Sequence, residues 1–410
     1  MTSDLLTVKL EKLTYGSDAL GRLSDGRAVF VPFALPGETV SVRSLDEKRG
    51  HVRAGLVEVL EPSPDRIAPK CRHFGVCGGC HYQHLSYPAQ LFAKTAILRD
   101  QLTRIGKIEA PPGKQIVSSS SEWNYRNHVQ FHLSQAGKLG YVDAHSRNVI
   151  PITECHLPEP PLNALWPRLE FDPGLGLERL SLRLGVDEQA MLVLESESPD
   201  APELELEADL SVVHLAGDDA VVMAGDDHLI MPVNDRSFHV SAASFFQVNT
   251  GMAGKMVSHL QAHLPVSPAT TLLDVYCGVG LFSAFFAPRV GRLIGIESSS
   301  SACEDFAINL DEFDNVELYE ASAEEVLPVL DVKPDLVILD PPRAGLEKSV
   351  LEALLLLGPA RIAYVSCDPS TLARDAARLI AGGYRLTQVT PFDLFPQTYH
   401  IESISIFEKG

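Results

Sequence analysis

Thr271-Leu272-Leu273-Asp274-Val275-Tyr276-Cys277-Gly278-Val279-Gly280 predicts a buried strand that runs into a tight glycine turn. Gly278 and Gly280 lack a side chain, so the backbone of such a turn can approach a ligand closely. The position three after Gly280 is Ser283, so the third glycine of the dinucleotide fingerprint is missing. A ligand without a pyrophosphate is therefore favoured.

The sequence around this stretch alternates between strand, turn and helix from about residue 265 onward. Apolar strands end at Asp274, Glu297, Asp340 and Cys367. This rhythm predicts a doubly wound, largely parallel sheet, which binds ligands at the carboxyl ends of its strands. A carboxylate at Glu297 can accept both hydroxyls of a ribose. Together with the glycine turn it fits an adenosine ligand such as S-adenosylmethionine.

Asp340-Pro341-Pro342-Arg343 marks the end of a third strand. Two prolines cannot continue a central strand, so Asp340 stands at its tip. Alone, this motif is more often an ordinary stop between strand and loop. Its place after the glycine turn of a parallel sheet favours a position in the ligand pocket.

Cys367 lies at the end of a fourth strand, in Tyr364-Val365-Ser366-Cys367-Asp368-Pro369. A cysteine on an apolar strand is by default a small core residue. Here a helix begins directly after it, and the helix dipole favours a thiolate. Glu402, on the last predicted strand, is an acid in a largely buried sheet and needs a partner. A thiolate that attacks and a carboxylate that removes a proton form a workable pair.

Three cysteines cluster as Cys71-x5-Cys77-Gly78-Gly79-Cys80, and Cys155 follows far downstream. Zinc sites usually combine two C-x2-C pairs, and only one such pair is present. The spacing favours an iron–sulfur cluster over zinc, with four unconnected thiols as the third alternative. Cys277 and Cys303 are interpreted as structural cysteines. Seven cysteines and no visible export signal make a disulfide framework unexpected.

The N-terminal part predicts a separate small domain. Roughly five short strands in residues 1–60 suggest a closed barrel of the oligonucleotide-binding type, although any small β module fits the pattern equally well. Tyr87 to about Ile105 predicts a helix with Leu91, Leu98 and Leu102 on its buried face. Residues from about 123 to 240 alternate in short stretches that predict a mostly antiparallel sheet.

Charge is distributed unevenly along the 410 residues, whose formal net charge is −20. Residues 184–235 contain 14 acidic residues and no Lys or Arg, whereas residues 1–130 carry 17 basic against 13 acidic residues. The basic third leaves room for a face that binds a polyanion. No apolar run is long enough for a membrane helix, and the cytoplasm is the expected compartment.

Taken together, these motifs resemble the RNA uracil-5-methyltransferase family, specifically members with an N-terminal TRAM domain and a 4Fe-4S cluster. The resemblance also includes Pro36-Gly37-Glu38, Gln83-His84, Phe246-Gln247-Val248-Asn249 and His400-Ile401-Glu402, so it runs over nearly the whole chain. Leu281 departs from relatives that carry a polar residue after the glycine turn. Residues 160–235 match the family poorly.

The resemblance implies a multidomain α/β protein. Its parts would be a TRAM barrel at 1–60, a central iron–sulfur domain at 61–239 and a Rossmann-like methyltransferase domain at 240–410. It implies a nucleophile, Cys367, and a proton acceptor, Glu402. The residues it implies for the two cofactors are Gln247, Tyr276, Glu297 and Asp340 around S-adenosylmethionine, and Cys71, Cys77, Cys80 and Cys155 around the cluster.

The implied reaction is methylation of carbon 5 of a uridine through a covalent adduct between cysteine and carbon 6. We expect 23S ribosomal RNA as substrate, with a transfer RNA loop as the nearest alternative. Tyr125-Arg126-Asn127-His128 and the barrel are expected to bind the surrounding RNA. Two further alternatives are a cytosine-5 methyltransferase and an RNA-binding iron–sulfur sensor with a silent methyltransferase domain. No obligate protein partner is expected.

Overall fold

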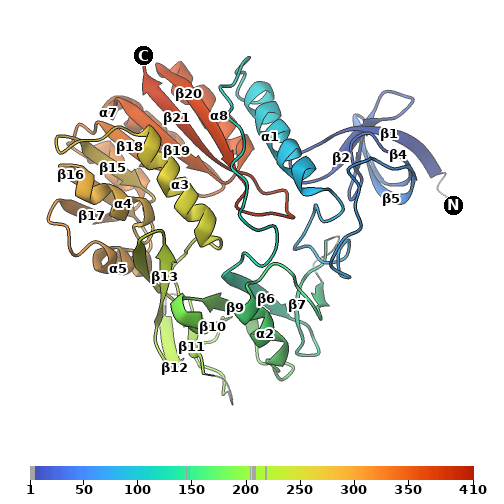
Figure 1. The fold of residues 1–410 in the computed structure, drawn as a ribbon, viewed down its shortest axis with the longest axis horizontal. Coiled ribbons are helices and arrows are strands. Elements are labelled where there is room, and N and C mark those ends of the chain that lie inside the picture. The colour runs from blue at the N-terminus through green and yellow to red at the C-terminus, as the bar shows by residue number, and fades with distance from the viewer. Residues whose placement is uncertain (1–4, 145, 147, 204, 206–208, 218) are drawn as a thin grey trace.

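The computed structural model describes residues 5–144, 146, 148–203, 205, 209–217 and 219–410. The chain forms a barrel at one end, a sheet domain at the C-terminus and a second sheet between them in sequence (Figure 1). Within the described residues, no helix is long and apolar enough to cross a membrane. Short 3-10 turns lie at Trp166–Arg168, Val186–Glu188, Ala287–Arg289 and Leu327–Val329.

The N-terminal strands close into a five-stranded barrel in the order β1-β2-β3-β5-β4, which confirms the predicted barrel. Alternate residues such as Val8, Leu10 and Val29 point into a fully buried core. Glu38 is buried at the start of β4, where it accepts a hydrogen bond of 2.9 Å from the Nη2 of Arg66 in the following linker. The strands are β1 (Leu5–Leu13), β2 (Ala19–Arg22), β3 (Ala28–Val31), β4 (Thr39–Glu47) and β5 (His51–Glu61).

The central region forms a seven-stranded sheet in the order β12-β11-β10-β9-β6-β7-β8, and all of its pairs except β10–β11 are antiparallel. The predicted mostly antiparallel sheet is therefore confirmed. A hairpin of β13 and β14 follows. The elements are β6 (His128–Leu133), β7 (Leu139–Val142), β8 (Val149–Pro151), α2 (Pro160–Leu165), β9 (Leu177–Leu184), β10 (Ala190–Ser196), β11 (Ser211–Ala216), β12 (Asp219–Ala224), β13 (His228–Val233) and β14 (Arg236–Ser241).

The C-terminal sheet has the order β17-β16-β15-β18-β19-β21-β20. Its first five strands are parallel, and β21 runs antiparallel to both of its neighbours. This is the predicted doubly wound sheet with an antiparallel end. The elements are α3 (Thr250–His263), β15 (Thr271–Val275), α4 (Leu281–Phe286), β16 (Arg292–Glu297), α5 (Ser300–Asn309), β17 (Val316–Glu320), α6 (Ala323–Val326), β18 (Leu336–Leu339), α7 (Lys348–Leu357), β19 (Arg361–Ser366), α8 (Pro369–Ala381), β20 (Tyr384–Phe392) and β21 (Glu402–Lys409).

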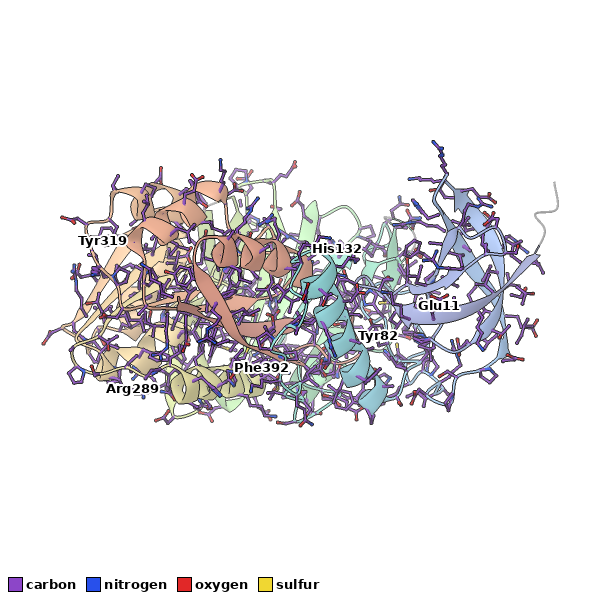
Figure 2. The ribbon with its side chains drawn as sticks, turned by 90° about the horizontal axis from the view of Figure 1, so that it is seen from above. Glu11, Tyr82, His132, Arg289, Tyr319 and Phe392 are labelled. Atoms are coloured by element: carbon purple, nitrogen blue, oxygen red, sulfur yellow. The ribbon has the colours of Figure 1, made fainter. Side chains whose placement is uncertain are left out.

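Helix α1 (Tyr87–Arg104) joins the barrel to the C-terminal sheet. It packs against α8 and β20, and Figure 2 shows Tyr82 just before it, where the barrel meets the rest of the molecule. The chain after α1 pairs with the edge of β20, through bridges of Gly113 with Val389 and Val117 with Phe392. Residues 87–117 therefore pack with the C-terminal sheet, although they precede the central sheet in sequence. The domain limits at 60 and 239 remain a prediction.

Candidate active site and cysteine site

The glycine turn is held by the neighbouring strand. The backbone N–H groups of Tyr276 and Cys277 both donate to the carbonyl of Ile296. Oε2 of Glu297 accepts from Gly278 N at 3.0 Å, and Oε1 accepts from the N–H groups of Ser298 at 2.7 Å and Ser299 at 2.9 Å. Oε2 keeps a second lone pair, so Glu297 can still accept a ribose hydroxyl through this oxygen.

Gly280 shows why this turn needs glycine. Its φ of +90° lies in the left-handed region, and a Cβ would come within 2.4 Å of Leu310 Cδ1. At Gly278, by contrast, a Cβ would meet nothing within 4 Å. Beneath the turn, Asp274 is fully buried and its Oδ1 has no hydrogen-bond partner, while Oδ2 accepts from Ser283 Oγ at 2.6 Å. The open space beside Gly278 leaves room for a ligand against the backbone of the turn.

Asp340 lies at this edge of the sheet, and Gln247 lies in a loop that contacts the segment before Glu402. Asp340 lies directly after β18, with its N–H donating to Val275 O at 3.2 Å, and burial raises the pKa of its carboxyl to about 7. Gln247 is half-buried in the loop before α3. Asn249 caps α3 and also donates to Leu394 O at 3.1 Å. The loop with Gln247 thus adjoins the segment that leads to Glu402.

Cys367 and Glu402 are brought together by the ladder between β19 and β21. The last registered pair is Ser366 with Ser403, and the next positions along the two antiparallel strands are Cys367 and Glu402. Glu402 is 7% exposed and Cys367 is half-buried. Two residues 35 positions apart in sequence therefore lie at one end of the sheet, beside Asp340.

The charge of Glu402 acts on the Cys367 thiol. Burial, and next the carboxylates of Glu402 and Asp340, raise the pKa of the Cys367 thiol to about 12. Burial, and next the charge of Asp340, raise the pKa of Glu402 well above its usual range, while Arg343 and Lys94 lower it. Helix α8 begins at Pro369, two residues after Cys367, where its dipole opposes the rise in the pKa of this thiol.

The four other predicted ligands, Cys71, Cys77, Cys80 and Cys155, line one cavity. The loop that carries three of them is shaped around glycine, because a Cβ on Gly78 would lie 2.8 Å from Val142 O. Backbone N–H groups donate to two of the sulfurs, His73 to Cys71 and Gly79 to Cys77, each at 3.4 Å.

The spacing of these thiols bears on the metal. Among the described residues, no three of these sulfurs lie within 4.8 Å of one another. A zinc ion holds its thiolates about 3.8 Å apart, from Zn–S bonds of about 2.3 Å. Burial raises the pKa of all four thiols, that of Cys77 to about 11 and that of Cys80 to about 12, so metal binding would displace protons.

The segment expected to bind RNA, Tyr125-Arg126-Asn127-His128, points largely inward, so this prediction was wrong for two of its residues. Tyr125 and Asn127 are buried, and Asn127 donates to Gln247 O at 3.1 Å. Arg126 lines the cysteine cavity, with its guanidinium 5.7 Å from the ring of Phe395. The segment links the cysteine cavity to the cofactor side of the site.

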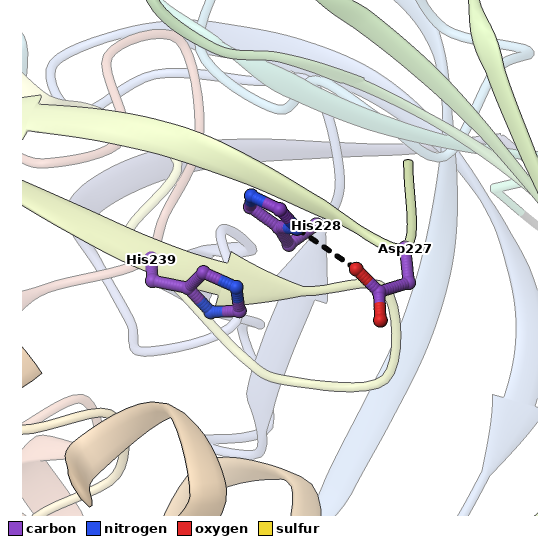
Figure 3. Close-up of side chains that lie close together, drawn as sticks. All are labelled: Asp227, His228 and His239. Carbon is purple, nitrogen blue, oxygen red and sulfur yellow. Dashed lines mark hydrogen bonds and ion pairs between the residues drawn. The ribbon is translucent and has the colours of Figure 1, made fainter. Parts of the chain in front are cut away.

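A second group of possible metal ligands lies on the β13–β14 hairpin (Figure 3). Asp227, His228 and His239 place their ligand atoms within 4.8 Å of one another. The two imidazoles stack with centroids 3.9 Å apart and planes 22° apart. A ring nitrogen binds a metal along its lone pair, in the ring plane, so two stacked rings cannot both face one ion. His239 instead pairs with buried Asp305 at 2.8 Å, which ties the hairpin to α5.

Sequence reasoning missed the residues that hold the loop 393–401, which precedes Glu402. Four successive carbonyls of this loop accept hydrogen bonds from four separate parts of the chain. The only available signal was Gln90 and Lys94, polar residues at helical spacing on the buried face of α1. Leu98 and Leu102 are buried on α1 as predicted, and Leu91 is half-buried. The pairs are Asn249 Nδ2 to Leu394 O, Lys94 Nζ to Phe395 O, Tyr125 Oη to Pro396 O, and His81 and Tyr82 N to Gln397 O.

Comparison with protein families matches residues 204–335 and 327–409 to tRNA (uracil-5-)-methyltransferase, and residues 3–57 to the TRAM domain. The prediction of a poor family match over residues 160–235 was therefore wrong for residues 204–235. An uncharacterized RNA methyltransferase of Thermosynechococcus vestitus is 33% identical over 98% of this chain and 97% of its own length. Another from Synechocystis is 34% identical over 97% of this chain and 94% of its own length.

Among solved structures, the Pyrococcus abyssi tRNA (uracil-54, C5)-methyltransferase in complex with S-adenosyl-L-homocysteine superposes with a TM-score of 0.74. It is 24% identical, and the match covers 98% of this chain and all of that one. At this identity the likeness concerns the fold, which the two chains share from the barrel to the last strand.

Proposed function

The chain belongs to the tRNA (uracil-5-)-methyltransferase family, and from that premise we propose that it methylates carbon 5 of a specific uridine in 23S ribosomal RNA through a covalent adduct with Cys367. Membership makes it an RNA uracil-5-methyltransferase that uses S-adenosylmethionine. The observation that carries the covalent route is the ladder of β19 and β21, whose next positions are Cys367 and Glu402. A uridine in transfer RNA is the second candidate, favoured by the description of the matching family.

The proposed mechanism answers a chemical difficulty, because carbon 5 of uracil is a poor nucleophile. Cys367 Sγ gives its proton to solvent and bonds to carbon 6, and the electrons of the carbon 5–carbon 6 double bond move into an enolate. S-adenosylmethionine, when bound, supplies the methyl group that carbon 5 takes from its sulfonium. Glu402 then removes the proton on carbon 5, the double bond re-forms, and Cys367 leaves as a thiolate.

The cofactor would lie at the carboxyl edge of the parallel sheet. Glu297 would accept one of its ribose hydroxyls, and Tyr276, at the left-handed φ of +64°, would border it with Gln247 and Asp340. Leu281 follows the turn as a buried residue, so no polar side chain at that position adds a contact. These roles rest on the family motifs and on the meeting of three of the residues at one sheet edge.

We propose that Cys71, Cys77, Cys80 and Cys155 hold a 4Fe-4S cluster. The observation behind this is the shared cavity, with its sulfurs spaced more widely than a zinc site requires. The cluster would supply a rigid joint between two distant segments of the chain, and no electron transfer is needed for the methylation. The barrel would bind the RNA around the target base, which must leave its stack at a cost of a few kcal/mol.

Methyl transfer from labelled S-adenosylmethionine to unmodified 23S ribosomal RNA and to bulk transfer RNA tests the proposal. We expect 5-methyluridine in the ribosomal RNA alone, and none with Cys367→Ala. Product only in transfer RNA would keep the chemistry and move the substrate to the second candidate. Protein that carries its cluster and methylates neither RNA would contradict the proposal and favour an RNA-binding sensor.

A further inference from the structure

The loop 393–401 carries Glu402 into the site and is held by buried contacts from α1. Gln90 Nε2 donates to Gln397 Oε1, and Gln397 N donates to Gln90 Oε1, each at 3.0 Å. One helical turn further, Lys94 Nζ donates to Phe395 O at 2.9 Å and to Asp393 Oδ1 at 2.6 Å. Helix α1 therefore contacts this loop through the polar side chains of Gln90 and Lys94 rather than through apolar packing.

The ion pair of Lys94 and Asp393 is unusual because both side chains are 0% exposed. Burying two charges costs several kcal/mol for each ion, which their mutual attraction rarely exceeds. An apolar pair would avoid this cost but would remove the donor of Phe395 O. The ammonium group therefore holds the loop, and the neighbouring site offers a second use for its charge.

The pair lies beside Glu402. Phe392 is the cross-strand partner of Glu402 in the β20–β21 ladder, and Asp393 is the next residue after Phe392. Burial lowers the pKa of Lys94, whereas Asp393 and next Glu402 favour its ammonium form, and the charge of Lys94 in turn lowers the pKa of Glu402. Three charged groups act on Glu402: Asp340 after β18, Arg343 in the following loop and Lys94 from α1. The other titratable groups near it are Cys367 after β19, and His400 and Asp393 in the 393–401 loop.

We propose that Lys94 is a positioning residue for the proposed proton acceptor: its ammonium group anchors the 393–401 loop and stabilises the carboxylate form of Glu402. This inference rests on the proposed function. It concerns the last chemical step, removal of the proton on carbon 5, and leaves the attack of Cys367 to other groups.

The sign of the effect follows from the charges. Burial and Asp340 already raise the pKa of Glu402, and Lys94 opposes them. Without the ammonium group that pKa rises further, so a smaller fraction of Glu402 is ionised at a given pH. The acid limb of methylation then moves to higher pH. Lys94→Met also leaves the charge of Asp393 unbalanced. The acid limb should therefore move further in Lys94→Met than in the double variant Lys94→Met with Asp393→Asn.

Two RNA probes separate proton removal from the earlier steps. Release of tritium from a ribosomal RNA transcript labelled at carbon 5 of uridine reports proton removal. A transcript with 5-fluorouridine reports the covalent adduct, because fluorine cannot leave as a proton does. For Lys94→Met we expect adduct formation within about twofold of wild type and tritium release slowed about tenfold near neutral pH, because a smaller fraction of Glu402 is ionised.

Matched variants distinguish charge from folding. Lys94→Arg keeps the charge and should recover most of the tritium release, whereas Lys94→Met with Asp393→Asn keeps the deficit without a lone buried carboxylate. Wild-type release and acid limb in the double variant would overturn the inference. Equal loss of adduct and release in all three variants would also overturn it, since that indicates a general structural role. If wild-type protein makes no 5-methyluridine, the proposed function itself fails, which is a separate result.

Discussion

The thiol of Cys367 and the four thiols of the cysteine cavity lie in different electrostatic environments. Cys367 faces carboxylates, and after burial it is Glu402 and Asp340 that raise the pKa of its thiol. The cysteines of the cavity face one another, and N–H groups from His73 and Gly79 point at two of their sulfurs. A thiol beside proton acceptors is suited to covalent chemistry. Thiols gathered around a cavity and supplied with N–H donors are suited to a metal core.

Replacing the nucleophile should give the largest effect. Cys367→Ala is expected to lower kcat by a factor of about 10⁴ or more, because no other group can form the adduct. Its iron content and melting temperature should stay at wild-type values, since the residue lies outside the cysteine cavity. Methyl transfer, iron analysis and thermal unfolding on the same preparation check this. Residual activity above a hundredth of wild type would contradict the assignment.

Replacing a cavity thiol should reverse that pattern. Cys80→Ala is expected to lose iron first and to lower the melting temperature by about 5 °C or more, because the free energy of metal binding is also folding free energy. Methylation should decline with iron content instead of vanishing at once. Cys303→Ala, a buried cysteine outside the cavity, is the control and should keep its iron. A Cys80→Ala protein with wild-type iron content would contradict the assignment of Cys80 as a cluster ligand.

More of the catalytic site than of the cysteine cavity could be predicted from the sequence. Strand tips and prolines mark Asp340 and Cys367 locally, and a parallel sheet then brings such tips to one edge. The register of β21 against β19 is a tertiary fact, yet an acid in a buried strand already pointed to Glu402. Spacing alone could not show that Cys155 reaches the other three cysteines, because 75 residues separate it from Cys80.

The inward orientation of Tyr125-Arg126-Asn127-His128 could not be derived from sequence either. A short stretch with aromatic and basic side chains suits RNA and a buried junction equally well. The orientation of this stretch is set by the 393–401 loop, because the buried carbonyls of this loop need hydrogen-bond donors. This need can be seen only in the three-dimensional structure. Lys94 was overlooked for the same reason, since a lysine on an amphipathic helix is normally assigned to the exposed face.

A pair of glycine substitutions, one in the glycine turn and one outside it, tests whether the turn binds the cofactor. Gly280→Ala should weaken binding of S-adenosylmethionine about tenfold to a hundredfold, because its Cβ would meet Leu310 and displace the turn. Gly383→Ala suffers a similar backbone strain, at a φ of +97°, but its Cβ meets nothing within 4 Å. Calorimetric titration should show near-normal binding for Gly383→Ala only. Equal losses in both would mean that strain, and not the turn, sets the affinity.

The smallest effect tests whether carboxylates set the reactivity of Cys367. Glu402→Gln removes one of the charges that raise the pKa of this thiol, so its apparent pKa for alkylation should fall from about 12 by a fraction of a unit to about one unit. Iodoacetamide labelling of cluster-bearing protein between pH 8 and pH 10, read by mass spectrometry of the Cys367 peptide, measures this. The variant should thus alkylate a few times faster while it loses turnover. Burial still dominates the pKa, so the thiol stays largely protonated at neutral pH. Unchanged or slower labelling would mean that Glu402 carries no charge toward Cys367, and the contrast with the cavity thiols would then rest on burial alone.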